Sequence, residues 1–118
     1  ALGGAPRDHA KALELFERAA NQGHVGAMFA VGALYGGGHD VTPDVVTAQR
    51  WFRKAAERNN AYAQLMLGRY LARGVAGDRD LDAARLWLQR AQAQGIAEAA
   101  QELAIVDDPL PERVIARH

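Results

Sequence analysis

The sequence has 118 residues, which is about one domain, and its 14 basic and 14 acidic residues give a formal net charge of zero. This balance creates no field that would attract nucleic acid or an anionic membrane, and no apolar run approaches the roughly 18 residues of a membrane span. The absence of cysteine excludes disulfides and thiolate metal sites and is compatible with periplasm and cytoplasm alike, so the compartment stays unknown.

A repeat with a period of 36 residues runs along the chain. The stretch 48–68 (AQRWFRKAAERNNAYAQLMLG) matches the stretch that lies 36 residues earlier (ALELFERAANQGHVGAMFAVG) column by column. The columns that keep one residue type are Asp8, Asp44 and Asp80; Ala12, Ala48 and Ala84; Ala19, Ala55 and Ala91; and Ala27, Ala63 and Ala99. A fixed period of roughly 20–50 residues is typical of a solenoid, whose units bury their apolar faces by stacking.

Each unit predicts two helices. In the middle unit, Ala48, Phe52 and Ala55 share one helical face, and Asp44 stands at the N-cap position. Residue types that tolerate a left-handed helix C-cap follow at Gly23, Asn59 and Gly95. In chain order, the expected helices are 8–22, 25–35, 44–58, 61–73, 80–94 and 97–106. We therefore predict an all-α solenoid of about three helix-turn-helix repeats, at 8–43, 44–79 and 80–106.

Small and large residues recur in separate columns. The small ones stand at 27, 63 and 99 and at 32, 68 and 104, whereas the large pairs are Leu15-Phe16, Trp51-Phe52 and Trp87-Leu88. Small residues let neighbouring helix axes approach closely, and the large side chains fill the remaining volume. A cofactor-binding role for Trp51-Phe52 is the rival interpretation, but the recurrence of the pair favours core packing.

Three motifs resemble a known family. They are GALYGGG at 32–38, D-x-x-x-A-x-x-W-F-x-K-A-A at 44–56, and A-x-x-x-L-G from Ala63. Over about residues 1–104 the chain resembles the Sel-like repeat (SLR) family, solenoid relatives of the tetratricopeptide repeats, whose own period is about 34 residues. The sequence departs from the family pattern at Tyr70, one position before the column of Tyr35, and at Asn59 and Ala104, where glycine is typical.

The resemblance implies a right-handed α/α solenoid that acts as a non-catalytic scaffold or adaptor for multiprotein complexes. In bacteria, such proteins are often found in signalling, envelope or secretion assemblies, in the periplasm or the cytoplasm. The alternative function is a structural or regulatory arm of a larger enzyme or of an envelope or secretion assembly.

Both ends of the array leave alternatives open. Residues 1–8 align with the inter-repeat stretches 37–44 and 73–80, which suggests that preceding repeats or another domain have been removed; a naturally disordered start is the alternative. At the other end, 107–118 departs from the repeat and holds Pro109 and Pro111. It forms either a short capping helix with Val114 and Ile115 or a frayed tail.

Motifs for catalysis or ligand chemistry are weak. The glycine-rich stretch 36–40 lacks the Lys-Ser/Thr of a phosphate-binding loop, so a helix-terminating loop explains it better. The histidines, at 9, 24, 39 and 118, have no metal-ligand spacing and are interpreted as solvated side chains. With no Ser and no Cys, nucleophilic catalysis lacks a credible residue, and the paired carboxylates Asp107-Asp108 fit a turn or cap better. We therefore expect no enzyme activity, no cofactor and no metal.

The first helix of each unit has an outward face, opposite Ala48, Phe52 and Ala55, that we predict to bind a protein or peptide. Steps of about 100° per residue place the partner-binding candidates there. They are Glu14, Glu17, Val46, Arg50, Arg53, Glu57, Leu86 and Gln89. In the family that the chain resembles, this helix lines the concave face, so the expected groove would change from acidic to basic to partly apolar. Neutral surface drift would give the same variation.

Two further surface features are noted. Arg18, Lys54 and Arg90 form a basic column, which we interpret mainly as aliphatic stems covering apolar surface near a helix C-terminus; a basic stripe for acidic partners is the alternative. Exposed Val46 and Leu86 make self-association a further expectation.

Overall fold

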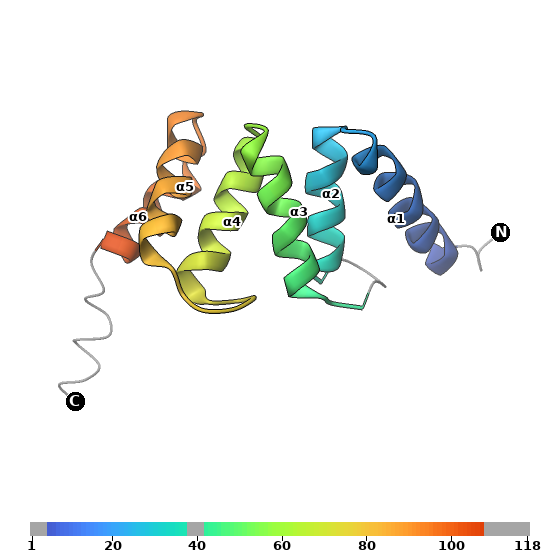
Figure 1. Cartoon of the computed structure of the whole chain (residues 1–118), viewed down its shortest axis with the longest axis horizontal. Coiled ribbons are helices and arrows are strands. Elements are labelled where there is room, and N and C mark those ends of the chain that lie inside the picture. The colour runs from blue at the N-terminus through green and yellow to red at the C-terminus, as the bar shows by residue number, and fades with distance from the viewer. Residues whose placement is uncertain (1–4, 38–41, 108–118) are drawn as a thin grey trace.

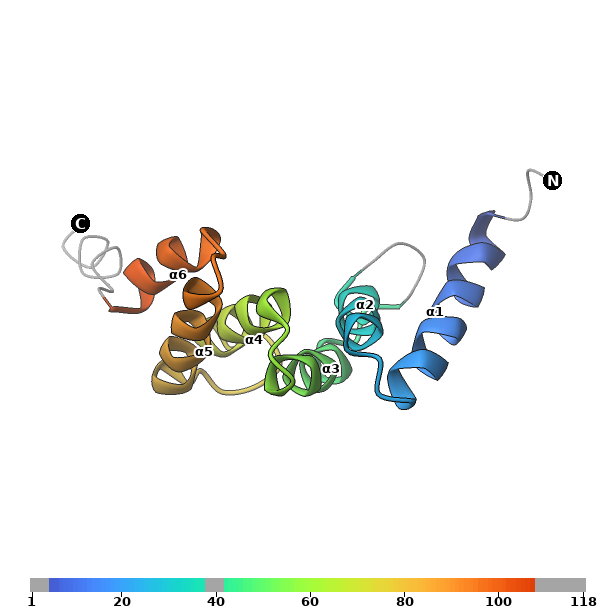
Figure 2. The same ribbon diagram turned by 90° about the horizontal axis from the view of Figure 1, so that it is seen from above.

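The structure is a computed structural model that describes residues 5–37 and 42–107. All regular structure within these ranges is helical: α1 (Ala5–Asn21), α2 (Val25–Tyr35), α3 (Val45–Glu57), α4 (Ala61–Arg73), α5 (Leu81–Ala93) and α6 (Glu98–Asp107). The helices follow one another along the long axis in chain order (Figure 1), and each packs mainly on its neighbours in the sequence. Seen from above, the array is one helix pair after another (Figure 2), and the buried apolar side chains form one hydrophobic cluster that runs along it. The expected all-α solenoid is confirmed.

The predicted helix bounds are confirmed to within one residue, except at the start of the first helix. Helix α1 begins at Ala5, so the prediction that residues 1–8 form an inter-repeat loop is wrong for 5–8. Pro6 is compatible with this early start because the first turn of a helix needs no N–H donor. Residues 1–4, and the predicted cap or tail with Pro109, Pro111, Val114 and Ile115, lie outside the described residues.

Helix N-caps recur with the repeat. The side chains of Asp44 and Asp80 accept hydrogen bonds from the backbone N–H of Thr47 and Ala83, at 3.1 and 3.0 Å, which confirms the predicted cap at Asp44. The second helices use another column, in which Asn60 caps α4. The equivalent residue in the first repeat is His24, whose Nδ1 accepts from the N–H of Ala27 at 3.0 Å. This exposed histidine, expected only to be solvated, therefore also begins α2.

Adjacent repeats interlock at a column of glycines. A Cβ atom at Gly32 in α2 would lie 2.7 Å from two ring carbons of Phe52 in α3. One repeat later, a Cβ at Gly68 in α4 would lie 2.6 and 2.7 Å from side-chain carbons of Leu88 in α5. Separations this short do not occur between real atoms, so only glycine permits this approach. The prediction that small columns receive large side chains is confirmed at both junctions.

Phe52 is the centre of an aromatic cluster that joins three helices. Its ring is 1% exposed and lies 5.7 Å from the ring of Phe29 in α2 and 5.4 Å, edge to face, from that of Tyr70 in α4. Such aromatic pairs contribute about 0.5–1.5 kcal/mol beyond their burial. Burial raises the pKa of Tyr70 above its usual value. The displacement of Tyr70 by one position from the column of Tyr35 therefore places its ring against Phe52.

Ion pairs fasten the last helix. Glu102 of α6 is 8% exposed, and both its carboxylate oxygens accept hydrogen bonds from Arg73 of α4, at 3.0 and 2.9 Å. Arg69 of α4 also lies 3.3 Å from this carboxylate. Asp107 at the end of α6 accepts a hydrogen bond from Arg85 of α5 at 2.6 Å. It was expected only to serve a turn or cap, but it also joins two helices. Helix α6 is thus held by charge to both α4 and α5.

The turn between α3 and α4 carries an amide network around the buried side chain of Gln64. Asn59 adopts a left-handed φ of 73°, equivalent to Gly23 and Gly95 in the other repeats. Its side-chain oxygen accepts from Nε2 of Gln64 at 3.4 Å and from Nε2 of Gln94 at 3.3 Å. Gln94, just beyond α5, also donates to Oε1 of Gln64 at 2.9 Å. Gln64 is 1% exposed, so this network satisfies a buried polar group and links the second repeat to the third.

The Gly32–Phe52 contact predicts a coupled effect. Gly32→Ala should lower the free energy of unfolding by about 1–3 kcal/mol because the new methyl group overpacks the junction. In a Phe52→Val background most of this loss should disappear, since the ring carbons that the methyl group would meet are gone. Urea unfolding of the four variants in this cycle measures the coupling, and an equal loss in both backgrounds would contradict the contact.

The Asn59 network predicts a difference between two substitutions. Asn59→Gly and Asn59→Ala both remove the side-chain oxygen, but only alanine is strained at positive φ, by about 1–2 kcal/mol. The free energy of unfolding should therefore fall for both and fall further for alanine. If chemical denaturation finds Asn59→Gly as stable as the wild type, the side-chain hydrogen bonds of Asn59 contribute nothing to stability.

Candidate protein-binding surface

The predicted partner-binding residues lie on α1, α3 and α5, the first helices of the three repeats. We call each of these a helix A, and the predicted residues together the helix A face. Its members are Glu14, Glu17, Val46, Arg50, Arg53, Glu57, Leu86 and Gln89. Six are exposed, whereas Glu17 and Arg53 are partly buried. Val46 and Leu86 are each 47% exposed, which is high for apolar side chains. The expected exposure of the face is therefore correct for six of the eight residues.

The column Glu14, Arg50 and Leu86 changes its chemistry from one repeat to the next. Glu14 is paired within α1 to Arg18, at 3.5 Å between two exposed side chains, a contact of little energetic value. Arg50 lies near the start of α3, where hydrogen bonds from Thr47 and, less strongly, the charge of Arg50 lower the pKa of Asp44. Leu86 offers an apolar contact at the same place in α5. A partner lying along these helices would meet acidic, basic and apolar groups in turn.

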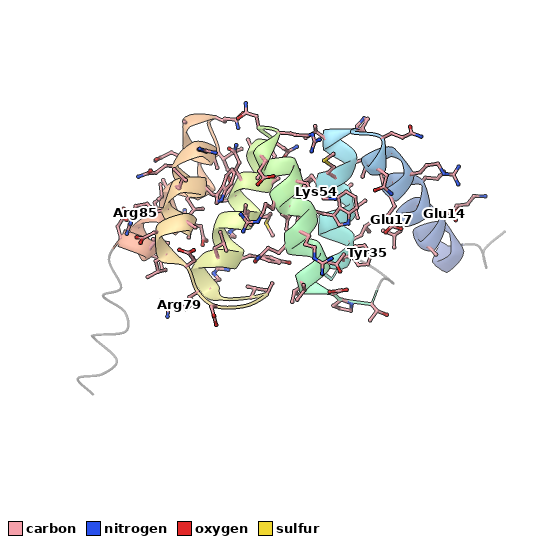
Figure 3. All side chains as sticks on the ribbon, in the orientation of Figure 1. Glu14, Glu17, Tyr35, Lys54, Arg79 and Arg85 are labelled. Atoms are coloured by element: carbon pink, nitrogen blue, oxygen red, sulfur yellow. The ribbon has the colours of Figure 1, made fainter. Side chains whose placement is uncertain are left out.

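Glu17 has a structural partner of its own. The hydroxyl of Tyr35 in α2 donates a hydrogen bond to the Glu17 carboxylate at 2.9 Å, and Figure 3 shows the two side chains side by side. This bond, followed by partial burial and by the charges of Glu17 and Asp44, raises the pKa of Tyr35. The equivalent of Tyr35 in the second repeat is Leu71, which has no hydroxyl. Glu17 thus ties α1 to α2 in addition to any contact with a partner.

The basic column is stacked on tryptophan. Nζ of Lys54 lies 4.6 Å from the ring centroid of Trp51, and the guanidinium of Arg90 lies 4.8 Å from that of Trp87. Both are cation–π contacts between residues three apart on one helix. The first repeat has Arg18 in this column but Leu15 in place of the tryptophan. Lys54 and Arg90 therefore cover apolar surface, as expected, by stacking on a ring.

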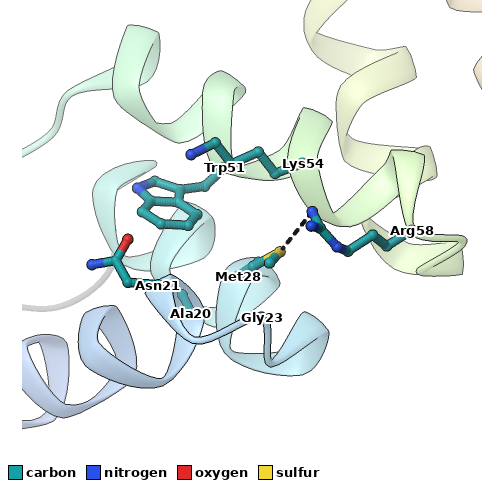
Figure 4. A pocket seen from close by; sticks show the side chains of 7 residues that line it. All are labelled: Ala20, Asn21, Gly23, Met28, Trp51, Lys54 and Arg58. Atoms are coloured by element: carbon teal, nitrogen blue, oxygen red, sulfur yellow. Dashed lines mark hydrogen bonds between the residues drawn. The ribbon is translucent and has the colours of Figure 1, made fainter.

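A pocket of about 220 Å³ opens beside this stack, between the first and second repeats. It is lined by Ala20, Asn21, Gly23, Met28, Trp51, Lys54 and Arg58 (Figure 4). Nη1 of Arg58 approaches Sδ of Met28 at 4.0 Å. The sequence had indicated Trp51 and Lys54 as packing residues but had not pointed to Arg58. The missed signal lies in the column of Arg58, which is Gln22, Arg58 and Gln94 in the three repeats.

The part of the chain that the structure describes has neither a cluster of metal-binding side chains nor a membrane-spanning helix. There, no three His, Cys, Asp or Glu side chains come together as a metal ion would require. Among the same residues, no helix combines the length and the apolar character needed to cross a membrane.

Comparison with protein families decides what this array is. The Sel1 repeat model matches residues 2–24, 25–60 and 61–96, which together make up most of the chain. The chain belongs to the Sel1 repeat family. The last two matched units begin with the second helix of one predicted repeat and end after the first helix of the next, and they keep the spacing of 36 residues between positions 25 and 61.

Similar proteins are found among solved structures and among curated sequences. A Sel1 repeat protein from Oxalobacter formigenes has a TM-score of 0.74 at 30% identity, over 79% of this chain and 38% of that one. A protective antigen present in uropathogenic Escherichia coli strains, which displays an SLR fold, has a TM-score of 0.78 at 32% identity, over 84% of this chain and 21% of its own. The chitin synthase regulator SKT5 of Malassezia restricta is 33% identical over 102 residues, which is 85% of this chain and 7% of that regulator.

These comparisons support a general role. Sel1 repeats in general mediate protein–protein interaction, and the SLR fold is typical of non-catalytic interaction scaffolds. The chain spans well under half the length of each of these three relatives. Their whole-protein activities are therefore not transferred to it.

The Tyr35–Glu17 bond predicts a pH effect. Because the pKa of Tyr35 is raised on folding, its stabilising contribution is complete below the unfolded value of about 10 and is lost as pH rises through the folded value. Tyr35→Phe should cost about 0.5–1.5 kcal/mol at neutral pH and should show a shallower loss of stability in alkaline solution. Urea unfolding at pH values on either side of 10 measures this, with Tyr62→Phe, at an exposed ring, as control. Parallel pH profiles for wild type and Tyr35→Phe would contradict it.

Proposed function

We propose that this chain is a protein-interaction module whose helix A face holds a peptide segment or a partner domain. One observation carries the proposal: the columns that pack repeats together keep their chemistry, whereas the exposed column of Glu14, Arg50 and Leu86 changes at each step. Packing requires the constancy, but nothing in the fold requires the variation. A surface that contacts a different chemical group of a partner at each repeat would vary in this way.

The family supports the same role. Among the relatives, the SKT5 protein is named as a regulator of chitin synthase. A regulator acts by engaging another protein, and a rigid array of packed helices suits this task because its exposed side chains are already held in place. In this chain, the helix A face would be the surface that engages such a protein.

A second candidate is a structural or regulatory arm of a larger protein. Leu15 and Phe16 of α1 are 53% and 41% exposed, although they occupy the columns of Trp51-Phe52 and Trp87-Leu88. In α3 and α5, Phe52 and Leu88 from these columns are buried against the preceding repeat. The exposed pair in α1 favours packing of this end against further protein, and this role would not require a free partner at the helix A face.

Site-specific cross-linking separates the two candidates. A photoreactive benzoylphenylalanine at position 50 or 86 should capture the same protein from native extract. At the exposed control position 33 in α2 it should not. The double variant Arg50→Glu with Leu86→Asp, which reverses one charge and places another on an apolar position, should reduce capture at position 89 at least tenfold, while circular dichroism shows unchanged helicity. Capture at position 33 alone, or no capture at any position, would overturn the helix A face proposal in favour of the arm.

A further inference from the structure

The residues that line the pocket between the first and second repeats have counterparts, one period later, between the second and third. We call these places the first and second junctions. Adding 36 to each residue that lines the pocket gives its counterpart at the second junction: Ala56, Glu57, Asn59, Gln64, Trp87, Arg90 and Gln94. The tryptophan with its stacked cation is kept at both junctions. The residues in the other columns differ between the junctions. These differences decide whether side chains of the chain itself fill the space.

At the second junction the space is bridged by amides. Gln94 donates to Gln64 at 2.9 Å and to the backbone oxygen of Asn59 at 3.0 Å, so α5 is joined to the turn of the preceding repeat. The corresponding residues at the first junction are Arg58, Met28 and Gly23. Neither methionine nor glycine offers a side-chain oxygen, and within the described part of the chain the Arg58 side chain has only the contact of 4.0 Å with the Met28 sulfur. The first junction therefore remains open as the pocket.

The two junctions also differ in charge. At the second junction, Arg90 and Glu57 occupy the columns of Lys54 and Asn21. The first junction holds two cations, Lys54 and Arg58, and has the neutral amide of Asn21 in the column of Glu57. Among the residues that the structure describes, no carboxylate lies within salt-bridge distance of either Lys54 or Arg58. The pocket thus has two positive charges and holds a neutral amide in the column where the next repeat has a carboxylate.

We propose that the pocket at the first junction binds the carboxylate of an acidic side chain on an extended segment of a partner protein. Lys54 and Arg58 pair with the carboxylate, and the Trp51 ring with Met28 contacts the apolar side chain beside it. At about 220 Å³ the pocket is smaller than the roughly 300–1,000 Å³ of sites for drug-sized ligands, which favours one side chain over a cofactor. The assignment rests on the proposed function as a protein-interaction module and names the group that the module recognises.

The competing explanation is that the cations serve the helix itself. Lys54 lies in the last turn of α3 and Arg58 is its C-cap residue, and positive charge is favoured at a helix C-terminus. This explanation predicts no selectivity for a carboxylate ligand. It also predicts the same behaviour of Lys54 and of Arg90, which occupies the last turn of α5.

The two tryptophans provide matched reporters, since the sequence has one at each junction and no others. The probes are the blocked tripeptide acetyl-Leu-Glu-Leu-amide, its Leu-Gln-Leu analogue, and inorganic phosphate. In proton–nitrogen NMR spectra of the full chain, the Glu peptide should shift the indole N–H signal of Trp51 saturably and leave that of Trp87 unchanged. Equal shifts with the Gln peptide or with phosphate, or equal shifts at Trp87, would overturn the assignment.

Surface variants test the two cations. Lys54→Gln and Arg58→Gln should each weaken binding of the Glu peptide by about threefold to fivefold, as expected for solvent-exposed pairs. Arg90→Gln, the matched change at the second junction, should leave the affinity unchanged. Unaltered binding in both Lys54→Gln and Arg58→Gln would overturn the proposal. Because these side chains are exposed, neither change is expected to unfold the chain, and circular dichroism checks this.

A transplant then tests the comparison between junctions. Gly23→Asn, Met28→Gln and Arg58→Gln together give the first junction the three amides of the second, and the Trp51 shift should be lost while helicity is kept. Retained binding in this folded variant would overturn the proposal. If the transplant does not fold, the exposed variants decide alone. Loss of the pocket assignment would leave cross-linking at positions 50 and 86 unaffected, so its failure differs from failure of the proposed function.

Discussion

The seating of Phe52 against Gly32, and of Leu88 against Gly68, is the contact on which the rest of the structure depends. A pair of helices cannot bury its own apolar face, so each repeat needs its neighbour at close range. The glycine column sets this range because any side chain there would collide with the inserted group. Everything else on α3 follows from this registration: Trp51 and Lys54 reach the turn of the first repeat, and Phe52 meets Phe29 and Tyr70.

The two junctions share one packing contact but differ in the side chains around their turns. The glycine contact is the same at both junctions, whereas the columns around the turns are free to differ. One junction uses them for a satisfied network of Asn59, Gln64 and Gln94; the other keeps an open pocket with two cations. Burial of Gln64 is tolerable only because each of its polar atoms finds a partner. The Met28 side chain has no polar group that needs a hydrogen-bond partner. The first junction is therefore stable although its pocket stays open.

The separation of packed columns from exposed columns suits a protein that binds others. Sequence changes at exposed columns alter what the surface presents without disturbing the contacts that hold the array together, since the two sets of residues lie on different faces of α1, α3 and α5. Glu17 shows where the division is incomplete. It belongs to the helix A face by periodicity, yet it accepts a hydrogen bond from Tyr35 and so also holds the first repeat together.

By itself, the sequence determined the helices, their order and the columns that pack, because a period of 36 residues and the alternation of small and large residues reflect local helix geometry and nearest-neighbour stacking. Asp44 as a cap and Gly32 as a close approach follow from the same local rules. Only the tertiary structure decided which polar side chains meet across a junction. Gln94 and Asn59 are 35 residues apart, and Glu102 and Arg73 are 29 apart, so no helical period relates them. The pocket of Trp51, Lys54 and Arg58 arose in the same way, because it depends on where the turn of one repeat lies against the next.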